Sequence, residues 1–405
     1  MFEPTRQAAL ARLAAVNPKA YASTRNALEG AVTYLSPYIT HGFLTLTDVL
    51  KAVHCKHPLP LGHKFVFELG WRAYFQHVWA HDGERIFASL HEGPLPDDAY
   101  AQALPPDIRE GRTGIAAIDM AVHTLYTTGY LHNHARMWLA SYVVHVRRVH
   151  WRAGADWLYG HLLDGDLASN HLSWQWVAGT GSHKPYLFNA DNVAQYAPAQ
   201  WHSQGTCIDI GYDAMQAIAC GGKLPRLAAL GTTALGMIEP TLLHTPPVEY
   251  GFTQPAASLV AGRHVRLIHP WSLGATGTAA STIASAATMQ DADSITVAMC
   301  PAELTARFAW SPARWRFVCQ ALAAHTPHLW FGNSSDLVRV LSEARSVQGT
   351  HNLHLPVAWQ TLRLSPQPLF AQPPLRRCQS FSQYWNAVTG KLGSVEELIS
   401  SVGAI

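Results

Sequence analysis

The chain is poor in charged residues and has no cysteine pattern that would bind zinc. Only 14% of its 405 residues are charged, and its formal net charge is +2. This balance neither requires nor excludes a nucleic-acid partner, so a local basic patch would have to contact phosphates. The six cysteines form no CxxC pair and no metal-finger spacing. Scattered thiols of this kind fit a reducing cytosol.

Targeting, membrane and metal signals are missing as well. The first six residues lack the basic-then-apolar order of a signal peptide. The softest apolar run, residues 273–289, is rich in Thr, Ser and Gly and is not predicted to cross a membrane. No HExxH motif and no HxH pair beside acids occurs, so the 23 histidines predict no metal site. We expect a cytoplasmic protein without a membrane partner, its oligomeric state left open.

The chain is long enough for two domains, and its texture changes along the sequence. Residues 1–222 are predicted to be mainly helical, because apolar residues recur at spacings of three and four. This spacing runs through residues 65–81, 114–128, 132–151 and 153–163, punctuated by Gly129 and Gly154. Residues 223–262, with several Pro, Gly and Thr, are the predicted linker.

Residues 263–405 are predicted to form a small α/β domain with a C-terminal tail. Strand-like runs alternate with helical stretches, which favours parallel strands. The strand-like runs are residues 264–269, 294–299 and 327–332, and the helical stretches include residues 314–324 and 336–344. No glycine-rich loop follows the first strand, so this Rossmann-like layer is not expected to hold a complete dinucleotide site.

The stretch DGDLASNHLSWQW combines more polar and aromatic groups than a core helix needs. Asp164 and Asp166 flank a glycine, and Asn170, Trp174 and Trp176 follow. If residues 167–179 are helical, Asn170 and Trp174 share a face while Trp176 points to a second environment. A buried polar organic cofactor would use all of them, although the two acids could also belong to a surface loop.

A second group lies on the predicted helix at residues 65–81. Glu68, Trp71 and Arg72 are three and four positions apart and share one face. A surface Glu–Arg pair beside a core tryptophan would show the same pattern. Gly70 weakens the helix, as expected where another group must approach closely.

Two further groups contain arginine. Asn133, Arg136 and Met137 share a face, as they would in a capped helix start with a solvated arginine. If Arg136 is buried, its guanidinium needs a carboxylate, and the two acids of the DGD stretch are the natural partners. Arg147 and Arg148 could contact phosphates, although such a run is more often a solvated helix face.

These motifs, in this order, resemble the FAD-binding helical domain of the DNA photolyase/cryptochrome family. The resemblance covers roughly residues 20–200, about half of the chain. The matching motifs are Thr33-Tyr-Leu35-Ser36-Pro-Tyr38, Glu68-Leu-Gly-Trp71-Arg72, Asn133-His-Ala-Arg136-Met137 and Asp164-Gly-Asp166…Asn170…Trp174-Gln-Trp176.

The resemblance implies that FAD is bound in a folded form by two groups of residues. The group on the phosphate side would be Tyr21, Thr33, Leu35 and Ser36. The group around the flavin would be Arg72, Asn133, Arg136, Asp164, Asp166 and Asn170. Arg72 and the Arg136–Asp164 pair would brace the ring. Asp166 would bond its polar edge, and Asn170 would face its N5 atom.

The resemblance also implies a pocket for damaged DNA. Glu68 would protonate or hydrogen-bond a pyrimidine dimer and stabilise the charge of an arriving electron. Trp71 and Trp176 would be its walls, and Asn133 and Met137 its floor. The 6-4 branch of the family has histidines in place of the last two residues, so this chain is expected to act on cyclobutane dimers.

Light-driven reduction of the flavin would need a series of oxidisable aromatic residues. Trp174 beside the flavin and Trp151 behind it match the first two carriers of the family. The third falls near Tyr100, where the family usually has tryptophan, and Trp138 or Trp157 are alternatives.

The chain departs from the family pattern in two respects. The family motif usually reads Thr-Arg-Leu-Ser, and this chain has Tyr34 in place of the arginine. The positive charge that would contact phosphate or the DNA backbone is therefore missing at this position. The α/β antenna domain, which normally comes first, is expected at the C-terminus as a permuted, shortened version. Residues 310–317, 328–332 and 381–385 resemble its segments. No antenna residue can be transferred, so an antenna chromophore is left open.

The resemblance implies a light-driven DNA repair flavoprotein, a carbon–carbon lyase of the deoxyribodipyrimidine photolyase type. Its partner would be UV-damaged DNA, single- or double-stranded, and its electron donor would be excited reduced FAD. One alternative is a cryptochrome-like blue-light photoreceptor, which has no need of a lesion pocket. Another is a flavin-containing protein that binds single-stranded nucleic acid without repairing it.

Overall fold

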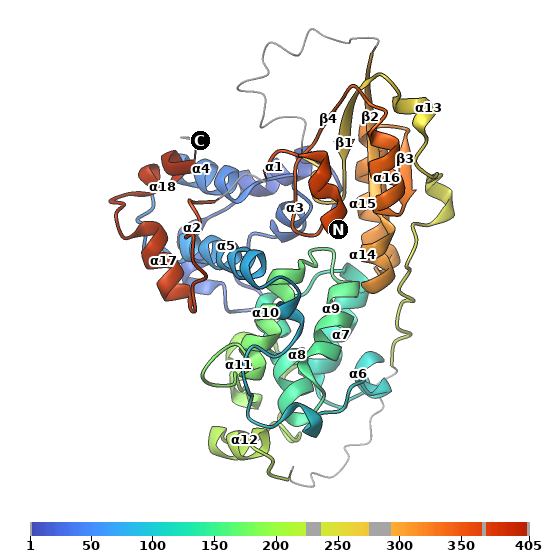
Figure 1. Cartoon of the computed structure of the whole chain (residues 1–405). Coiled ribbons are helices and arrows are strands. Elements are labelled where there is room, and N and C mark those ends of the chain that lie inside the picture. Colours follow the sequence, from blue (N-terminus) through green and yellow to red (C-terminus); the bar gives the residue numbers. More distant parts are fainter. Residues whose placement is uncertain (1, 224–235, 275–292, 367–369, 403–405) are drawn as a thin grey trace. The chain divides into compact units, whose positions relative to one another are not determined.

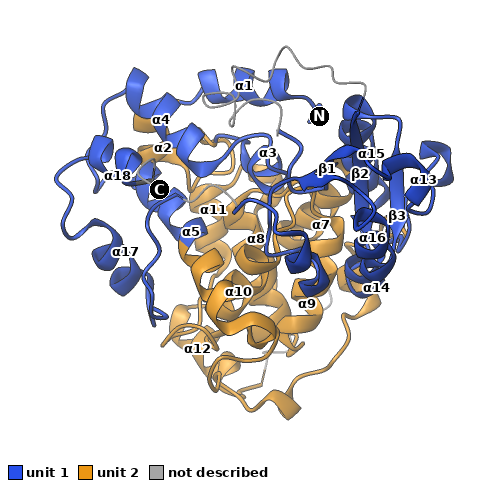
Figure 2. Ribbon diagram, turned by 45° about the horizontal axis from the view of Figure 1, so that its top comes forward, with its two compact units in different colours: residues 1–16, 33–73, 242–405 blue, residues 17–32, 74–241 orange. Residues whose placement is uncertain are grey.

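The computed structural model describes residues 2–223, 236–274, 293–366 and 370–402. Most of the apolar run at 273–289 and part of the expected linker lie outside these ranges. The chain divides into two compact units (Figure 2). Unit 1 comprises residues 1–16, 33–73 and 242–405, and unit 2 comprises residues 17–32 and 74–241. The sequence-based division at 222 and 262 stays a prediction beside this one.

Unit 2 is built from helices (Figure 1). Its elements, with short 3-10 and π turns labelled η, are α2 (Pro18–Thr24), η1 (Gly83–Phe87), η2 (Asp97–Ala99), α6 (Pro106–Arg109), α7 (Ala116–Thr128), α8 (Asn133–Ser141), η3 (Tyr142–Val146), α9 (Trp151–His161), α10 (Leu167–Ala178), α11 (Ala190–Tyr196), η4 (Ala199–Trp201) and α12 (Tyr212–Ala219). Helix α5 (Lys64–Asp82) belongs to unit 1 up to residue 73 and to unit 2 from residue 74.

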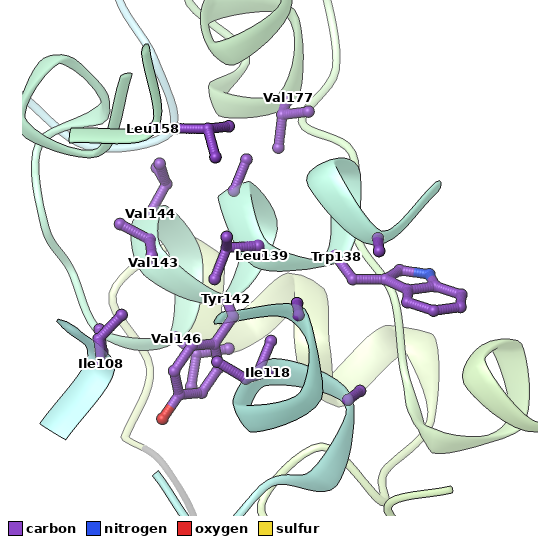
Figure 3. Close-up of a cluster of buried hydrophobic side chains, with 14 of the residues drawn as sticks. Ile108, Ile118, Trp138, Leu139, Tyr142, Val143, Val144, Val146, Leu158 and Val177 are labelled. Atoms are coloured by element: carbon purple, nitrogen blue, oxygen red, sulfur yellow. The ribbon is translucent and has the colours of Figure 1, made fainter. Parts of the chain in front are cut away.

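Helices α7 to α10 enclose the core of unit 2. Ile118, Leu139, Leu158 and Val177, one from each helix, are almost completely buried (Figure 3). Two glycines end helices of this group, because each adopts the left-handed conformation that closes a helix at low cost. Gly129 does so after α7 with φ 67°, and Gly179 after α10 with φ 80°.

The prediction of a helical segment over the whole of residues 132–151 is wrong. Helix α8 ends at Ser141, the π turn η3 follows, and α9 begins only at Trp151. Between them, the N–H of His150 donates to the carbonyl of Ala101, whose own N–H donates to Arg148, and Arg148 has a φ of 50°. These backbone bonds to a distant segment remove the chain from the helix, and the apolar spacing contains no sign of them.

Unit 1 contains a four-stranded parallel sheet in the order β3-β2-β1-β4. Its strands are β1 (His264–Ile268), β2 (Ser294–Pro301), β3 (Leu329–Gly332) and β4 (Ser346–Gln348). The three expected strands and their parallel pairing are confirmed, whereas β4 was not predicted. The sheet shares unit 1 with residues 1–16 and 33–73, so a separate Rossmann-like domain stays a prediction.

The other elements of unit 1 are helices and short turns that precede, separate and follow the strands along the chain. They are α1 (Arg6–Ala14), α3 (Ser36–Thr40), α4 (Leu46–Lys56), η5 (Val248–Tyr250), α13 (Ala257–Val260), α14 (Ala302–Arg307), α15 (Pro312–His325), α16 (Ser334–Leu341), η7 (Val357–Leu362), α17 (Phe381–Thr389) and α18 (Val395–Val402). Helices α15 and α16 confirm the two expected helical stretches. Among the described residues, no helix has the length and apolar character needed to cross a membrane.

Candidate functional site

The predicted site residues are distributed over both units. Those in unit 1 are Thr33, Leu35, Ser36, Glu68, Trp71 and Arg72. Those in unit 2 are Tyr21, Tyr100, Asn133, Arg136, Met137, Arg147, Arg148, Trp151, Asp164, Asp166, Asn170, Trp174 and Trp176.

Arg136 and the buried carboxylate of Asp164 form an ion pair in unit 2. One terminal nitrogen of Arg136 lies 3.0 Å and 2.8 Å from the two carboxylate oxygens of Asp164, whose side chain is only 3% exposed. The Nε of Arg136 donates to the carbonyl of Leu131 at 2.7 Å, and its guanidinium lies over the ring of Tyr130. A buried carboxylate needs such a partner, because burial without one is costly. The predicted pair is therefore present.

Asp166 uses its two carboxylate oxygens for different partners. Oδ1 accepts the backbone N–H of Ser169 at 2.7 Å, so Asp166 is the N-cap of α10. Oδ2 accepts from the side-chain amide of Gln76 at 2.9 Å. Asp166 is 4% exposed, so both bonds are formed away from water. Gln76 was missed in the sequence, although it lies one helical turn after Arg72 on α5.

Asn170 and Trp174 lie one turn apart on the buried face of α10. The side-chain amide of Asn170 donates to the carbonyl of Ala155 at 2.8 Å, which fixes the orientation of the amide. Trp174 is 2% exposed and packs on Gly154 of α9. Trp176 is 38% exposed, so the prediction that the two tryptophans serve different environments is confirmed.

Trp151 connects the buried part of unit 2 with a surface acid. Its indole N–H donates to the Oγ of Ser89 at 3.0 Å, and Ser89 donates to the carboxylate of Asp97. The ring of His150 lies 5.6 Å from Trp151 and 6.3 Å from Tyr100, between ring centroids. Burial raises the pKa of Tyr100. The expected third carrier is thus in contact with the histidine next to the second carrier.

The predicted floor of the lesion pocket is at the start of α8. Asn133 is exposed, and its side-chain amide lies 3.6 Å from the sulfur of Met137. Trp176, on α10, lies beside Tyr186 with ring centroids 5.8 Å apart. Tyr21, on α2, is partly buried. These side chains keep access to the surface, as a substrate contact requires.

Arg147 and Arg148 are both engaged within unit 2. Arg147 forms a two-point ion pair with Asp107 at 2.7 Å and 3.1 Å and also donates to the hydroxyl of Tyr142. Arg148 donates to the carbonyl of Gly222 at 2.6 Å. These contacts favour a structural role for the basic run. Their proposed contact with DNA stays a prediction. The alternative, a solvated helix face, is wrong, because Arg147 and Arg148 lie between η3 and α9 and outside any helix.

The phosphate motif of unit 1 is a tight turn leading into α3. The hydroxyl of Thr33 accepts the N–H of Leu35 at 3.3 Å, Leu35 is buried, and Ser36 is the first residue of α3. Tyr34 between them has a φ of 53°, which is unusual for a residue with a side chain. The guanidinium of Arg12 lies 5.7 Å from the ring centroid of Tyr34. Positive charge is therefore present at this turn, although residue 34 supplies none.

On the unit 1 part of α5, Glu68 is exposed while Trp71 and Arg72 are partly buried. Arg72 donates to the hydroxyl of Thr40 at 2.6 Å. The ring of Trp71 is stacked on Phe381 of α17, a partner that no sequence motif revealed. The close approach expected at Gly70 is confirmed, since a Cβ there would lie 2.4 Å from the ring of Trp385.

The described part of the chain contains no set of side chains arranged as metal ligands. No group of three or more His, Cys, Asp or Glu side chains is placed to hold a metal ion among these residues. All six cysteines are free thiols.

Comparison with known proteins finds a family match over one segment of the chain. Residues 65–208 match the FAD binding domain of DNA photolyase. A deoxyribodipyrimidine photo-lyase of Synechococcus sp. is 32% identical over 214 residues, 48% of this chain and 43% of that protein. The cryptochrome DASH of Oryza sativa subsp. japonica is 34% identical over 173 residues, 40% of this chain and 29% of that protein. A solved cryptochrome of Synechocystis sp. covers 47% of this chain and 43% of its own, with 29% identity and a TM-score of 0.43.

Residues 65–208 of the chain match the FAD-binding domain of the DNA photolyase/cryptochrome family, which makes FAD the cofactor of this segment. The chain spans less than half the length of the relatives it matches. The donor set of unit 2 fits a flavin. Two buried carboxylates and an oriented amide, from Asp164, Asp166 and Asn170, lie within seven consecutive residues at the start of α10. Such groups match the N–H donors and carbonyl acceptors along the polar edge of the ring.

Proposed function

We propose that this chain is a light-driven, cytoplasmic DNA repair flavoprotein that splits cyclobutane pyrimidine dimers, a carbon–carbon lyase of the deoxyribodipyrimidine photolyase type. The observation that carries the proposal is the buried polar face at the start of α10. There Asp166 and Asn170 are oriented by hydrogen bonds to Gln76 and Ala155, with Trp174 one turn further on. A face fixed in this way is pre-organised for a flat polar cofactor.

In this proposal the residues of unit 2 hold and tune FAD. Arg136 and Asp164 brace the flavin, Asp166 binds its polar edge, and Asn170 presents its amide to the N5 side. Arg72 also braces the flavin. Thr33, Leu35 and Ser36 bind the phosphates, and Tyr21 lies on the same side of the cofactor. When bound, FAD supplies the excited electron donor, and the protein supplies binding, orientation and electrostatics.

Exposed and partly buried side chains form the proposed contact with DNA. Glu68 places a carboxyl group where negative charge develops on the dimer, which lowers the energy of the charged state. Trp71 and Trp176 are walls against the lesion, and Asn133 and Met137 complete the floor. A dimer is poorly stacked in its duplex, so moving it into such a pocket costs little. We propose UV-damaged DNA as the partner, as single or double strands.

Trp174, Trp151 and Tyr100 are the proposed electron carriers to the flavin. Trp151 and Tyr100 are linked through the ring of His150, which supports Tyr100 as the third member. We also propose that residues 263–405 correspond to a permuted, shortened antenna domain, because their parallel sheet has the layout expected of one.

A cryptochrome-like photoreceptor is the second candidate. The similarity to a cryptochrome DASH of Oryza sativa favours it, since that relative is as similar in identity as the photo-lyase. One assay separates the candidates. Photoreduced protein is mixed with a dimer-containing oligonucleotide in light and in darkness, and the absorbance of restored thymine is followed. Repair in light only is expected. Binding without repair would instead indicate the photoreceptor or a nucleic-acid-binding protein.

A companion variant tests the role of Glu68. Glu68→Ala is expected to retain FAD, because Glu68 is exposed, and to repair dimers at least about tenfold more slowly. Glu84→Ala, an exposed acid with no assigned role, is the control and should repair as the wild type does. Unchanged repair in Glu68→Ala would contradict the role given to this residue.

A further inference from the structure

The indole of Trp71 has a built-in stacking partner. The ring of Phe381 lies 4.2 Å from it between centroids, with an angle of 11° between the ring planes. Phe381 is the first residue of α17, whereas Trp71 is in the first part of α5. Both residues belong to unit 1, so this contact is internal to one compact unit.

Helix α17 is fixed to α5 independently of this stack. Trp385, 6% exposed, lies against the backbone of α5 at Gly70, where a Cβ would approach its ring to 2.4 Å. Phe67 contacts both α17 rings, with centroids 5.1 Å from Trp385 and 5.8 Å from Phe381. The loss of Phe381 alone would therefore leave α17 anchored through Trp385.

The Trp71–Phe381 pair has the most nearly parallel ring planes of these contacts, since Phe381 also stacks on Trp385 but at 23° and with 5.7 Å between centroids. Phe67 meets Phe381 at 61° and Trp385 at 42°, as in the tilted contacts that aromatic rings often adopt in proteins. The near-parallel stack fixes the plane of the indole instead. A side chain held in one plane loses less freedom when a flat ligand stacks on it, so it binds that ligand more tightly.

We propose that Phe381 is a positioning residue, which holds the indole of Trp71 in the plane required to stack with a pyrimidine base of DNA. The inference rests on the proposed function, in which Trp71 is a wall of the lesion pocket. It adds a residue from α17, outside the segment that matches the FAD-binding domain, to the determinants of substrate binding.

The test uses the full-length, FAD-loaded protein with Phe381→Leu. Leucine keeps the apolar contact with Phe67 and Trp385 but has no ring to stack. Phe381→Tyr keeps the ring, and Phe67→Leu is the matched control, since it alters the same cluster without touching the stack on Trp71. The measured quantity is the dark affinity for a fluorescent single-stranded oligonucleotide with one thymine dimer. FAD content and thermal midpoint are recorded for every variant.

Stacking on an aromatic side chain contributes roughly fivefold to 150-fold in affinity per base, so a partial loss of stacking should weaken binding roughly fivefold to thirtyfold. That loss is expected in Phe381→Leu, with Phe381→Tyr and Phe67→Leu within about twofold of the wild type. Equal losses of affinity in Phe381→Leu and Phe67→Leu would show that the Trp71–Phe381 contact contributes only packing, which would refute the positioning role. Tighter binding by Phe381→Leu would show that Phe381 occupies the place of the base, which also overturns the proposal.

Measurements on the wild type distinguish a failure of this inference from a failure of the proposed function. If it neither binds nor repairs dimer-containing DNA, the proposed function fails and this inference fails with it. If the wild type repairs dimers while Phe381→Leu binds normally, only the positioning role is refuted.

Discussion

Trp174 occupies the space that a side chain at Gly154 would need. A Cβ added to Gly154 would lie 2.3 Å from two atoms of the Trp174 ring. Alanine in a helix interior is normally favoured over glycine by about 1 kcal/mol. Overpacking a buried site costs about 1–3 kcal/mol, so the clash should outweigh the helix preference. The packing of Trp174 therefore requires glycine at position 154, although glycine lowers the stability of helix α9.

The Gly154→Ala variant should therefore lower the free energy of unfolding, measured in urea, by up to about 2 kcal/mol. FAD retention should also fall, because Trp174 lies one turn from Asn170. Gly62→Ala is the control, since nothing lies within 4 Å of a Cβ there. A Gly154→Ala protein as stable as that control would contradict the packing argument.

The Arg136–Asp164 pair should respond asymmetrically to mutation. Arg136→Gln leaves the almost fully buried carboxylate of Asp164 without its guanidinium, which should cost about 2–4 kcal/mol. Asp164→Asn should cost less, because Arg136 is 24% exposed and keeps its bond to Leu131. Urea unfolding measures both. Arg345→Gln, which breaks an exposed pair with Asp293, should change stability by less than about 1 kcal/mol.

Asp166 allows its structural and flavin roles to be separated. Asp166→Ala removes the N-cap of α10 and the bond from Gln76, so a loss of roughly 1–3 kcal/mol in unfolding free energy is expected. Asp166→Asn retains an oxygen for the cap and should lose less than about 1 kcal/mol. If Asp166 binds the flavin, Asp166→Asn should still release FAD more readily, as measured by flavin absorbance after gel filtration. Normal FAD retention in this variant would refute the flavin role.

Burial of His145 should make the protein sensitive to acid. The side chain is 1% exposed, and burial lowers the pKa of His145 to about 4. The unfolded chain takes up a proton near pH 6.5, whereas the folded chain does not until about pH 4. Stability from this group is complete above pH 6.5 and is lost as the pH falls from 6.5 to 4, by up to roughly 3 kcal/mol.

A His145→Gln variant removes this titration while keeping a donor for the carbonyl of Val177. Thermal midpoints of wild type and variant, recorded from pH 7.5 to 4.5, should converge or cross as the pH falls. Curves that stay parallel across this range would show that His145 does not contribute to the acid response.

Two kinds of feature could be predicted from the sequence. The first is an element that buries an apolar face, and the second is a contact that a buried charge requires. The helix of Asn170 and Trp174 and the Arg136–Asp164 pair are of these two kinds. The break before Trp151 was not predictable, because it depends on backbone bonds to Ala101. Strand β4 is only three residues long and lies at the edge of the sheet, too short for a hydrophobic pattern. The stack of Phe381 on Trp71 joins residues with no sequence relationship, and only the folded chain reveals it.

Unit 1 is assembled from segments that are synthesised at very different times. Arg6 donates to the carbonyl of Gly274, a contact across 268 positions of the chain. The main segment of unit 2, residues 74–241, is continuous and lies between them. Non-local contacts are slow to form, since the intervening chain must lose entropy before they contribute. On the ribosome, unit 2 can fold while Arg6 still lacks its partner Gly274, so the amides around Gly274 should be among the last to become protected from hydrogen exchange.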